Sequence, residues 1–122
     1  IVVDDSKMIL SVYRTTMHSL GWSVELFDMP AKALERLKGS GARPDLLITD
    51  LNMPEMTGIE LAAAIRAFIP SASLPILMVT TQHEPQDSDA ATKAGVNLVT
   101  HKPFTADSLS KAIDSIMAAP RK

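Results

Sequence analysis

The chain contains no cysteine, which excludes a disulfide framework and any site built on thiolate ligands. Aromatic residues are also scarce, at 4% of the chain, and no apolar run approaches the roughly 18 residues of a membrane-spanning helix. The net charge of −2 gives no general attraction to nucleic acid. No segment has the pattern of a signal peptide. We therefore expect a cytoplasmic protein without direct nucleic-acid or membrane contact.

The composition that remains is that of an ordinary globular protein. Hydrophobic residues make up 46% and charged residues 21% of the chain, which is too apolar for a disordered segment. With 122 residues, the length predicts one domain over residues 1–122. Ile1 stands inside an apolar run, so we expect the first strand to include residues that precede it.

Short apolar runs alternate five times with segments of helical period. The expected strands are residues 1–3, 22–27, 46–49, 75–79 and 98–101. Four of the expected helices have candidate N-caps in Ser6, Asp28, Thr57 and Thr105, and the remaining short helix, around residues 90–94, follows a polar loop over 82–89. This order predicts a parallel sheet that is covered by helices on both faces.

Polar side chains stand at the carboxyl ends of four of these strands. The residues concerned are Asp4 and Asp5 after the first strand, Asp50 after the third, Thr80 and Thr81 after the fourth, and Lys102 after the fifth. In an open parallel sheet all carboxyl ends meet at one edge, where ligands bind. We therefore expect three carboxylates, a hydroxyl group and an ammonium group to converge there.

Three neighbouring carboxylates predict a bound cation. Two unit charges about 4 Å apart repel by roughly 4 kcal/mol at an effective dielectric constant near 20, and one ammonium group does not offset three such charges. A ligand set of oxygens without histidine or cysteine suits Mg²⁺ or Mn²⁺ better than zinc. A cation, an ammonium group, a hydroxyl group and a nucleophilic carboxylate together indicate phosphoryl-transfer chemistry.

The same residues resemble the receiver domain of two-component response regulators, in particular the single-domain receivers of chemotaxis. The matching stretches are residues 3–6, 50–58, 79–81 and 94–104, and the resemblance spans the whole chain. It implies an α/β fold of flavodoxin type, a doubly wound (βα)5 sheet with five parallel strands in the order 2-1-3-4-5. It also implies a signalling switch and not a turnover enzyme.

The resemblance implies a role for each residue that would contact the phosphoryl group. Asp50 would accept the group from the phosphohistidine of a histidine kinase or phosphotransfer protein, or from a small phosphodonor. Lys102 would contact a phosphoryl oxygen, while the Thr80 hydroxyl group and the Thr81 amide would bind the others. The peptide bond between Lys102 and Pro103 is expected to be cis.

The metal site is implied in the same way. Asp5, Asp50 and the backbone carbonyl of Asn52 would bind Mg²⁺, or Mn²⁺, directly, and Asp4 would hold a metal-bound water. In this family the residue at Asn52 and the one at Gln82 tune the lifetime of the phosphoryl group.

Phosphorylation is then expected to change a surface made of the fourth helix, the fifth strand and the fifth helix. The partner that reads this surface would be a downstream target protein or a fused effector domain, and dimerisation is left open. One residue departs from the family pattern, because Val99 stands where an aromatic ring usually turns inward. A switch in this chain would therefore work through backbone and loop repacking, or be weaker.

Two other functions stay open at this point. The absence of an aromatic ring at Val99 is also consistent with a receiver-like module that serves interaction or dimerisation and does not switch on phosphorylation. A magnesium-dependent hydrolase with an aspartate nucleophile would need a substrate pocket and usually a cap domain, for which 122 residues leave little room.

Overall fold

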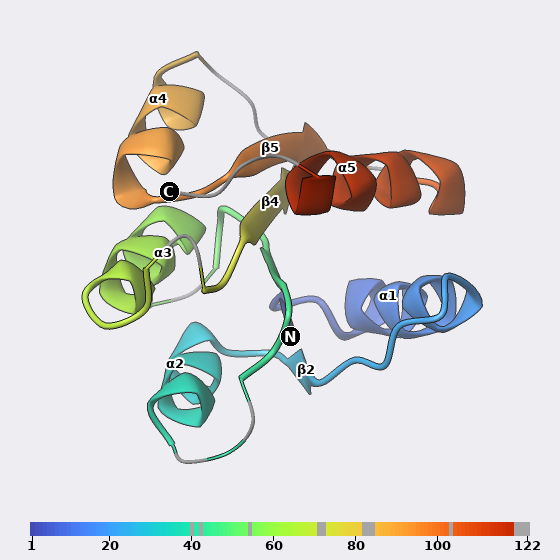
Figure 1. The fold of residues 1–122 in the computed structure, drawn as a ribbon, viewed down its shortest axis with the longest axis horizontal. Coiled ribbons are helices and arrows are strands. Elements are labelled where there is room, and N and C mark those ends of the chain that lie inside the picture. Colours follow the sequence, from blue (N-terminus) through green and yellow to red (C-terminus); the bar gives the residue numbers. More distant parts are fainter. Residues whose placement is uncertain are drawn as a thin grey trace.

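Five strands and five helices alternate along the chain, as the sequence predicts (Figure 1). The computed structural model describes residues 1–39, 41, 43–53, 55–70, 73–81, 85–102 and 104–118. The elements are β1 (Val2–Val3), α1 (Lys7–Ser19), β2 (Leu26–Phe27), α2 (Pro30–Lys38), β3 (Leu47–Thr49), α3 (Gly58–Arg66), β4 (Ile76–Thr80), α4 (Pro85–Ala94), β5 (Leu98–His101) and α5 (Ala106–Ala118).

The strands form one parallel sheet in the order β2-β1-β3-β4-β5, which confirms the predicted flavodoxin-like topology. Helices α1 and α5 cover one face of the sheet, and α2, α3 and α4 cover the other (Figure 1). All carboxyl ends therefore point to the same edge. Among the described residues, no helix is long and apolar enough to cross a membrane.

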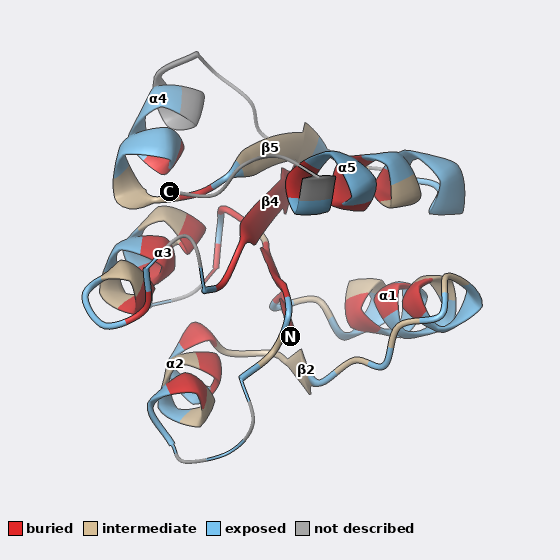
Figure 2. Ribbon diagram, viewed as in Figure 1, coloured by how far each residue is buried: buried red, intermediate tan, exposed pale blue. Residues whose placement is uncertain are grey.

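The core lies in two layers, one on each face of the sheet (Figure 2). Neighbouring strand residues alternate between them: Val3 and Met78 pack under α2, α3 and α4, whereas Val2 and Leu77 pack under α1 and α5. All four side chains are at most 1% exposed. Because both of their faces are buried, the inner strands β1, β3 and β4 are apolar except for a buried threonine at the carboxyl ends of β3 and β4.

Three of the four predicted N-caps are present. Ser6 accepts from the Ile9 amide, Thr57 forms a capping box with Glu60, and the Thr105 hydroxyl group accepts from the Ser108 amide. The prediction for Asp28 is wrong.

Helix α2 instead has Met29 as its N-cap, without a side-chain cap hydrogen bond, and Pro30 follows it. Asp28 lies one residue too early to reach the first free amides of the helix. Its carboxylate lies 3.4 Å from the Lys32 ammonium group instead.

Two predicted boundaries differ by several residues, and others by one. The strand predicted over residues 22–27 is limited to Leu26–Phe27, because this edge strand pairs only with β1, whose partners are Val2 and Val3. Helix α4 begins at Pro85, inside the segment predicted as a polar loop. Proline suits the first turn of a helix because its fixed φ is already helical. The residues of that loop before Pro85, Gln82 included, lie outside the described residues.

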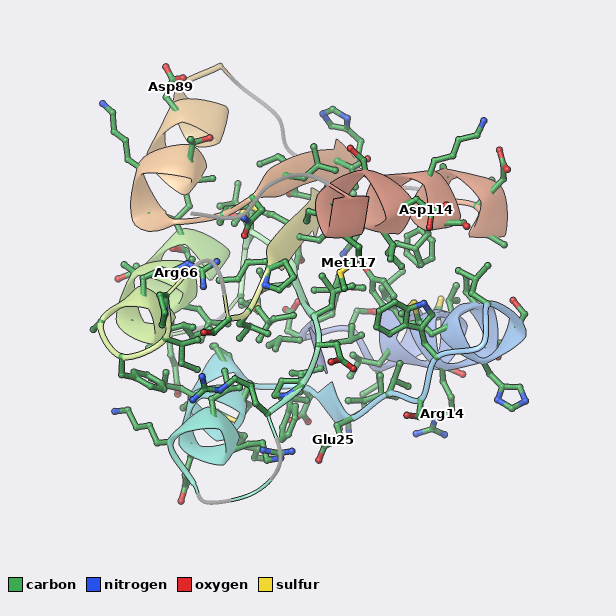
Figure 3. The ribbon with its side chains drawn as sticks, viewed as in Figure 1. Arg14, Glu25, Arg66, Asp89, Asp114 and Met117 are labelled. Atoms are coloured by element: carbon green, nitrogen blue, oxygen red, sulfur yellow. The ribbon has the colours of Figure 1, made fainter. Side chains whose placement is uncertain are left out.

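Arg66 connects α3 to the turn between α4 and β5 (Figure 3). Its Nε and Nη2 atoms both donate to the Gly95 carbonyl, at 3.0 and 2.9 Å, and Nη2 also donates to Asn97 Oδ1 at 3.0 Å. The same Asn97 oxygen accepts from the Ile76 amide at the start of β4. These bonds fix the start of β5, and hence the register that brings its other end to the site.

Candidate functional site

The three predicted carboxylates meet at the carboxyl edge of the sheet. One carboxylate oxygen from each of Asp4, Asp5 and Asp50 lies within 4.8 Å of the others. Asp4 is 1% exposed, Asp50 is half-buried and Asp5 is exposed. The cluster therefore runs from the interior to the solvent, and its outer side is accessible to an ion.

The inner carboxylate, that of Asp4, is already bonded at both oxygens. Oδ1 accepts from the Ser6 amide at 2.9 Å, which begins α1 beside the site. Oδ2 accepts from the Lys102 ammonium group at 2.6 Å. A buried carboxylate needs such partners to stay ionised.

Lys102 provides a positive charge beside Asp4 and Asp50. Its Nζ atom lies 2.6 Å from Asp4 Oδ2 and 3.4 Å from Asp50 Oδ2, and its side chain is 10% exposed. Its backbone amide donates to the Thr80 carbonyl at 2.9 Å, which ties the end of β5 to the end of β4. One ammonium group thus pairs with two of the three carboxylates, so the negative charge of the cluster is only partly compensated.

Burial raises the pKa of the Asp50 carboxyl group above its ordinary value of 3.8. The Lys102 charge opposes this shift, the Asp4 charge adds to it, and the Leu51 amide, which donates to Asp50 Oδ1 at 2.8 Å, again opposes it. The ionised carboxylate is the form that can act as a nucleophile, and the protein bears a cost in stability for holding it ionised.

The sign of this cost predicts the behaviour of Asp50→Asn. Between pH 3.8 and the raised folded pKa, the native state binds more protons at Asp50 than the unfolded state, so the free energy of unfolding falls as pH rises. We expect Asp50→Asn to be more stable than the unsubstituted protein at neutral pH, by on the order of 1 kcal/mol.

Urea unfolding across pH in the absence of divalent cations measures this difference. The stability advantage of Asp50→Asn should shrink as the pH falls toward 3.8, the ordinary pKa of the carboxyl group in the unfolded chain. Asp114→Asn, on the exposed side of α5 (Figure 3), is the control and should not show the same trend. A constant advantage of Asp50→Asn at all pH values would contradict the charge argument.

The loop after β3 folds back onto Asp50. The Gly58 amide donates to the Leu51 carbonyl at 2.8 Å, and the capping box of Thr57 begins α3 there. Asn52, whose backbone carbonyl is expected to bind metal, is exposed in this loop.

The two threonines lie at the same edge, at the end of β4. Thr80 is 1% exposed and Thr81 is exposed. Thr81 and Lys102 line one hollow of about 350 Å³, together with Ile9, Val12 and Phe104. The structure therefore brings the predicted site residues of all four strands to one edge. Pro103, whose peptide bond was expected to be cis, lies outside the described residues.

Residues 1–114 match the response regulator receiver domain family. The chain belongs to this family. It is 36% identical over 118 residues to the chemotaxis protein CheY1 of Helicobacter pylori, a match that covers 96% of this chain and 94% of that protein. It is also 36% identical to the CheY homolog of Campylobacter jejuni, over 96% of this chain and 90% of that protein.

Solved structures show the same fold. Chemotaxis protein CheY4 of Vibrio cholerae matches this receiver with a TM-score of 0.83 and 32% identity, over 94% of each chain. A probable two-component system response regulator/GGDEF domain protein matches with a TM-score of 0.86 and 24% identity. That match covers 95% of this chain and 47% of the other, longer chain.

Membership of this family gives the receiver its general function. It is a component of two-component signalling, a signalling protein and not a turnover enzyme, and its partners are a histidine kinase and a downstream target. The cluster of Asp4, Asp5 and Asp50 is consistent with a phosphoacceptor site of the magnesium-binding type.

Tyr13 is a residue near the site for which the sequence predicts no functional role. Tyr13 belongs to the buried stripe of α1 and is 1% exposed. Burial raises the pKa of its phenol above the ordinary value of 10.0, and the charges of Asp4 and Asp50 raise it further. No motif in the sequence indicates that this ring lies near the acids.

Proposed function

We propose that this receiver is a phosphorylation-controlled switch in which Asp50 accepts a phosphoryl group in a magnesium-dependent reaction. The observation that carries the proposal is the convergence of three carboxylates within 4.8 Å of one another, two of which, those of Asp4 and Asp50, also contact the Lys102 ammonium group. The donor would be the phosphohistidine of a histidine kinase or phosphotransfer protein, or a small phosphodonor. A single domain over residues 1–122 and a cytoplasmic location remain predictions.

The donor set supports Mg²⁺, with Mn²⁺ as the other cation that it fits. Only oxygen atoms are offered, and hard divalent cations prefer such ligands. Asp4 is 1% exposed and lies innermost, whereas Asp50 is half-buried and Asp5 is exposed, so Asp5 and Asp50 are the direct ligands that we propose, with the Asn52 carbonyl as a third and Asp4 acting through water. When bound, the cation would neutralise the carboxylates and the phosphoryl oxygens.

In the proposed reaction a carboxylate oxygen of Asp50 attacks phosphorus while the bond between phosphorus and the donor nitrogen breaks. The electron pair of that bond leaves with the imidazole, and an acyl phosphate remains on Asp50. Lys102, already 3.4 Å from Asp50, would bind a phosphoryl oxygen and offset the developing charge. The Thr80 hydroxyl group and the Thr81 amide would bind the other oxygens.

The output surface that we propose is formed by α4, β5 and α5. Thr80 pairs with His101 across the sheet, and its carbonyl accepts from the Lys102 amide. A movement of Thr80 or Lys102 toward a phosphoryl group would therefore displace the end of β5. Val99 packs against the core under α3 and α4, so backbone and loop repacking would carry the signal to a downstream target protein or effector domain.

The test is to incubate the protein with Mg²⁺ and acetyl phosphate and to measure the intact mass. We expect an adduct of one phosphoryl group that depends on Mg²⁺, is lost on treatment with hydroxylamine, and is absent from Asp50→Asn. Asp114→Asn should react like the unsubstituted protein. No adduct in the unsubstituted protein, or an equal adduct in Asp50→Asn, would defeat the proposal.

The second candidate is an interaction or dimerisation module that does not switch, and Val99 is the observation that favours it. Sedimentation measurements of oligomeric state with and without beryllofluoride, a phosphoryl mimic, together with amide NMR spectra, separate the two functions. Chemical-shift changes across α4, β5 and α5 on adding the mimic would exclude the second candidate. A spectrum that changes only around the acids would favour it.

A further inference from the structure

One aromatic pair connects α1 to the segment that carries Lys102. The rings of Tyr13 and Phe104 are stacked, with their centroids 4.6 Å apart and their planes 28° from parallel. It is the single stacked pair found among the described residues. Stacking of this kind contributes about 0.5–1.5 kcal/mol beyond the area that the rings bury.

Phe104 follows Lys102 at a distance of two residues, beyond the end of β5. Its ring packs into the core layer under α1 and α5, and it also lines the hollow of about 350 Å³ that Thr81 and Lys102 share. Close packing on all sides would hold a segment in one position, but a segment beside an open hollow is not held from that side. Its position therefore depends more on its remaining contacts, one of which is the stacked Tyr13 ring.

Tyr13 itself is held firmly. It is 1% exposed and lies in the buried stripe of α1 with Leu10 and Met17. Helix α1 begins at the Ser6 cap, and the Ser6 amide donates to Asp4. The ring that supports Phe104 thus belongs to the same rigid unit as the carboxylate that Lys102 contacts.

We propose that Tyr13 is a positioning residue for the phosphoryl-transfer site: by stacking on Phe104, it holds the segment after β5 so that the Lys102 ammonium group stays between Asp4 and Asp50. Asp4 is bonded to both parts of the structure that the ring pair joins. Its Oδ1 accepts from the amide of Ser6, the N-cap of α1, at 2.9 Å, and its Oδ2 accepts from the Lys102 ammonium group at 2.6 Å. An effect of Tyr13 on the rate of phosphorylation rests on the function proposed above. Its effect on the position of the Lys102 ammonium group does not depend on that function.

The first experiment tests the position without any phosphodonor. The NMR signals of the Lys102 side chain, assigned by comparison with Lys102→Met, are recorded together with the Asp4 carboxyl carbon. We expect them to shift in Tyr13→Leu and in Phe104→Leu but to stay in place in Tyr13→Phe, which keeps the ring. Unchanged Lys102 and Asp4 signals in folded Tyr13→Leu would overturn the proposal.

The second experiment measures the initial rate of phosphorylation by acetyl phosphate. We expect Tyr13→Leu to be slower by about tenfold, since misplacing a reacting group by about 1 Å can cost on the order of a hundredfold. Tyr13→Phe, which keeps the ring, should react at the rate of the unsubstituted protein. Tyr13→Leu with Phe104→Leu should be no slower than either single variant, because both act through one contact. Multiplicative losses would instead show two independent structural defects and reject the positioning role.

The two experiments separate the two proposals. If the unsubstituted protein takes up no phosphoryl group, the proposed function fails, while the Lys102 signals still decide whether Tyr13 positions the ammonium group. If phosphorylation proceeds and the signals do not move in Tyr13→Leu, the positioning role fails alone.

Discussion

Lys102→Met should lower the free energy of unfolding by about 3 kcal/mol in the absence of divalent cations, at the lower end of the cost of breaking a buried ion pair. Methionine keeps much of the length of the side chain but removes the charge that lies 2.6 Å from Asp4 and 3.4 Å from Asp50. Asp4, at 1% exposed, would then be a buried carboxylate whose remaining partner is the Ser6 amide. Urea unfolding measures the loss directly.

Divalent cation should reverse part of this loss. A ligand that binds only the native state stabilises it by about 2.7 kcal/mol at a concentration a hundred times its dissociation constant. In Lys102→Met the carboxylates no longer share their charge with an ammonium group, so we expect Mg²⁺ to raise the stability of this variant more than that of the unsubstituted protein.

The matched control is Lys111→Met. Lys111 pairs with Asp107 at 3.2 Å, but both side chains are more than 75% exposed, at 77% and 79%. Exposed pairs contribute little, so this variant should retain its stability and gain nothing extra from Mg²⁺. If Lys102→Met proved as stable as Lys111→Met without cation, the three acids would not repel one another in the native state, and the case for a cation site would fail with it.

The topology of the fold and the location of the site follow from simple features of the sequence. Apolar strands such as residues 46–49 end on polar residues, and in a parallel sheet such ends must share one edge. This reasoning places Asp4, Asp50 and Lys102 together without any knowledge of the contacts between them. The structure adds which carboxylate is buried and which oxygen the ammonium group meets, because both depend on side-chain packing between elements that are distant in sequence.

The features that sequence reasoning missed are set by tertiary contacts. The length of β2 depends on its single neighbour, β1, and local β propensity over residues 22–27 does not reveal that limit. The carboxylate of Asp28 pairs with Lys32 although its residue type favours an N-cap. The sequence assigns no role to Tyr13, since it does not reveal which ring lies opposite this residue in the fold.

Gly58→Ala is the backbone change with the largest expected effect at the site. A Cβ atom at this position would lie well inside contact distance of the Asp50 carbonyl oxygen and 3.0 Å from Met78 Cε. The carbonyl cannot easily retreat, because the Asp50 amide is bonded to the Val3 carbonyl at 3.1 Å and the Gly58 amide to Leu51 at 2.8 Å. The loop that leads from Asp50 to α3 must therefore move as a whole.

We expect Gly58→Ala to lower the free energy of unfolding by about 2 kcal/mol, within the range for overpacked positions. Alanine is a better helix former than glycine by about 1 kcal/mol in a helix interior, but Gly58 is the first helical residue, where this gain is smaller. Since Asp50 and the proposed Asn52 ligand lie in the displaced loop, the affinity for Mg²⁺ should also fall, by about tenfold. Urea unfolding and isothermal titration calorimetry with Mg²⁺ measure the two effects.

Gly39→Ala is the matched control, because its φ of −73° suits any residue and its nearest neighbour for a new Cβ atom is the Arg36 carbonyl at 3.4 Å. This variant should stay within about 0.5 kcal/mol of the unsubstituted protein and bind Mg²⁺ equally well. A Gly58→Ala protein that loses stability but keeps its Mg²⁺ affinity would show that the loop can shift without moving the carboxylates. The Asn52 carbonyl would then not be a ligand, and Asp5 and Asp50 alone would have to hold the ion.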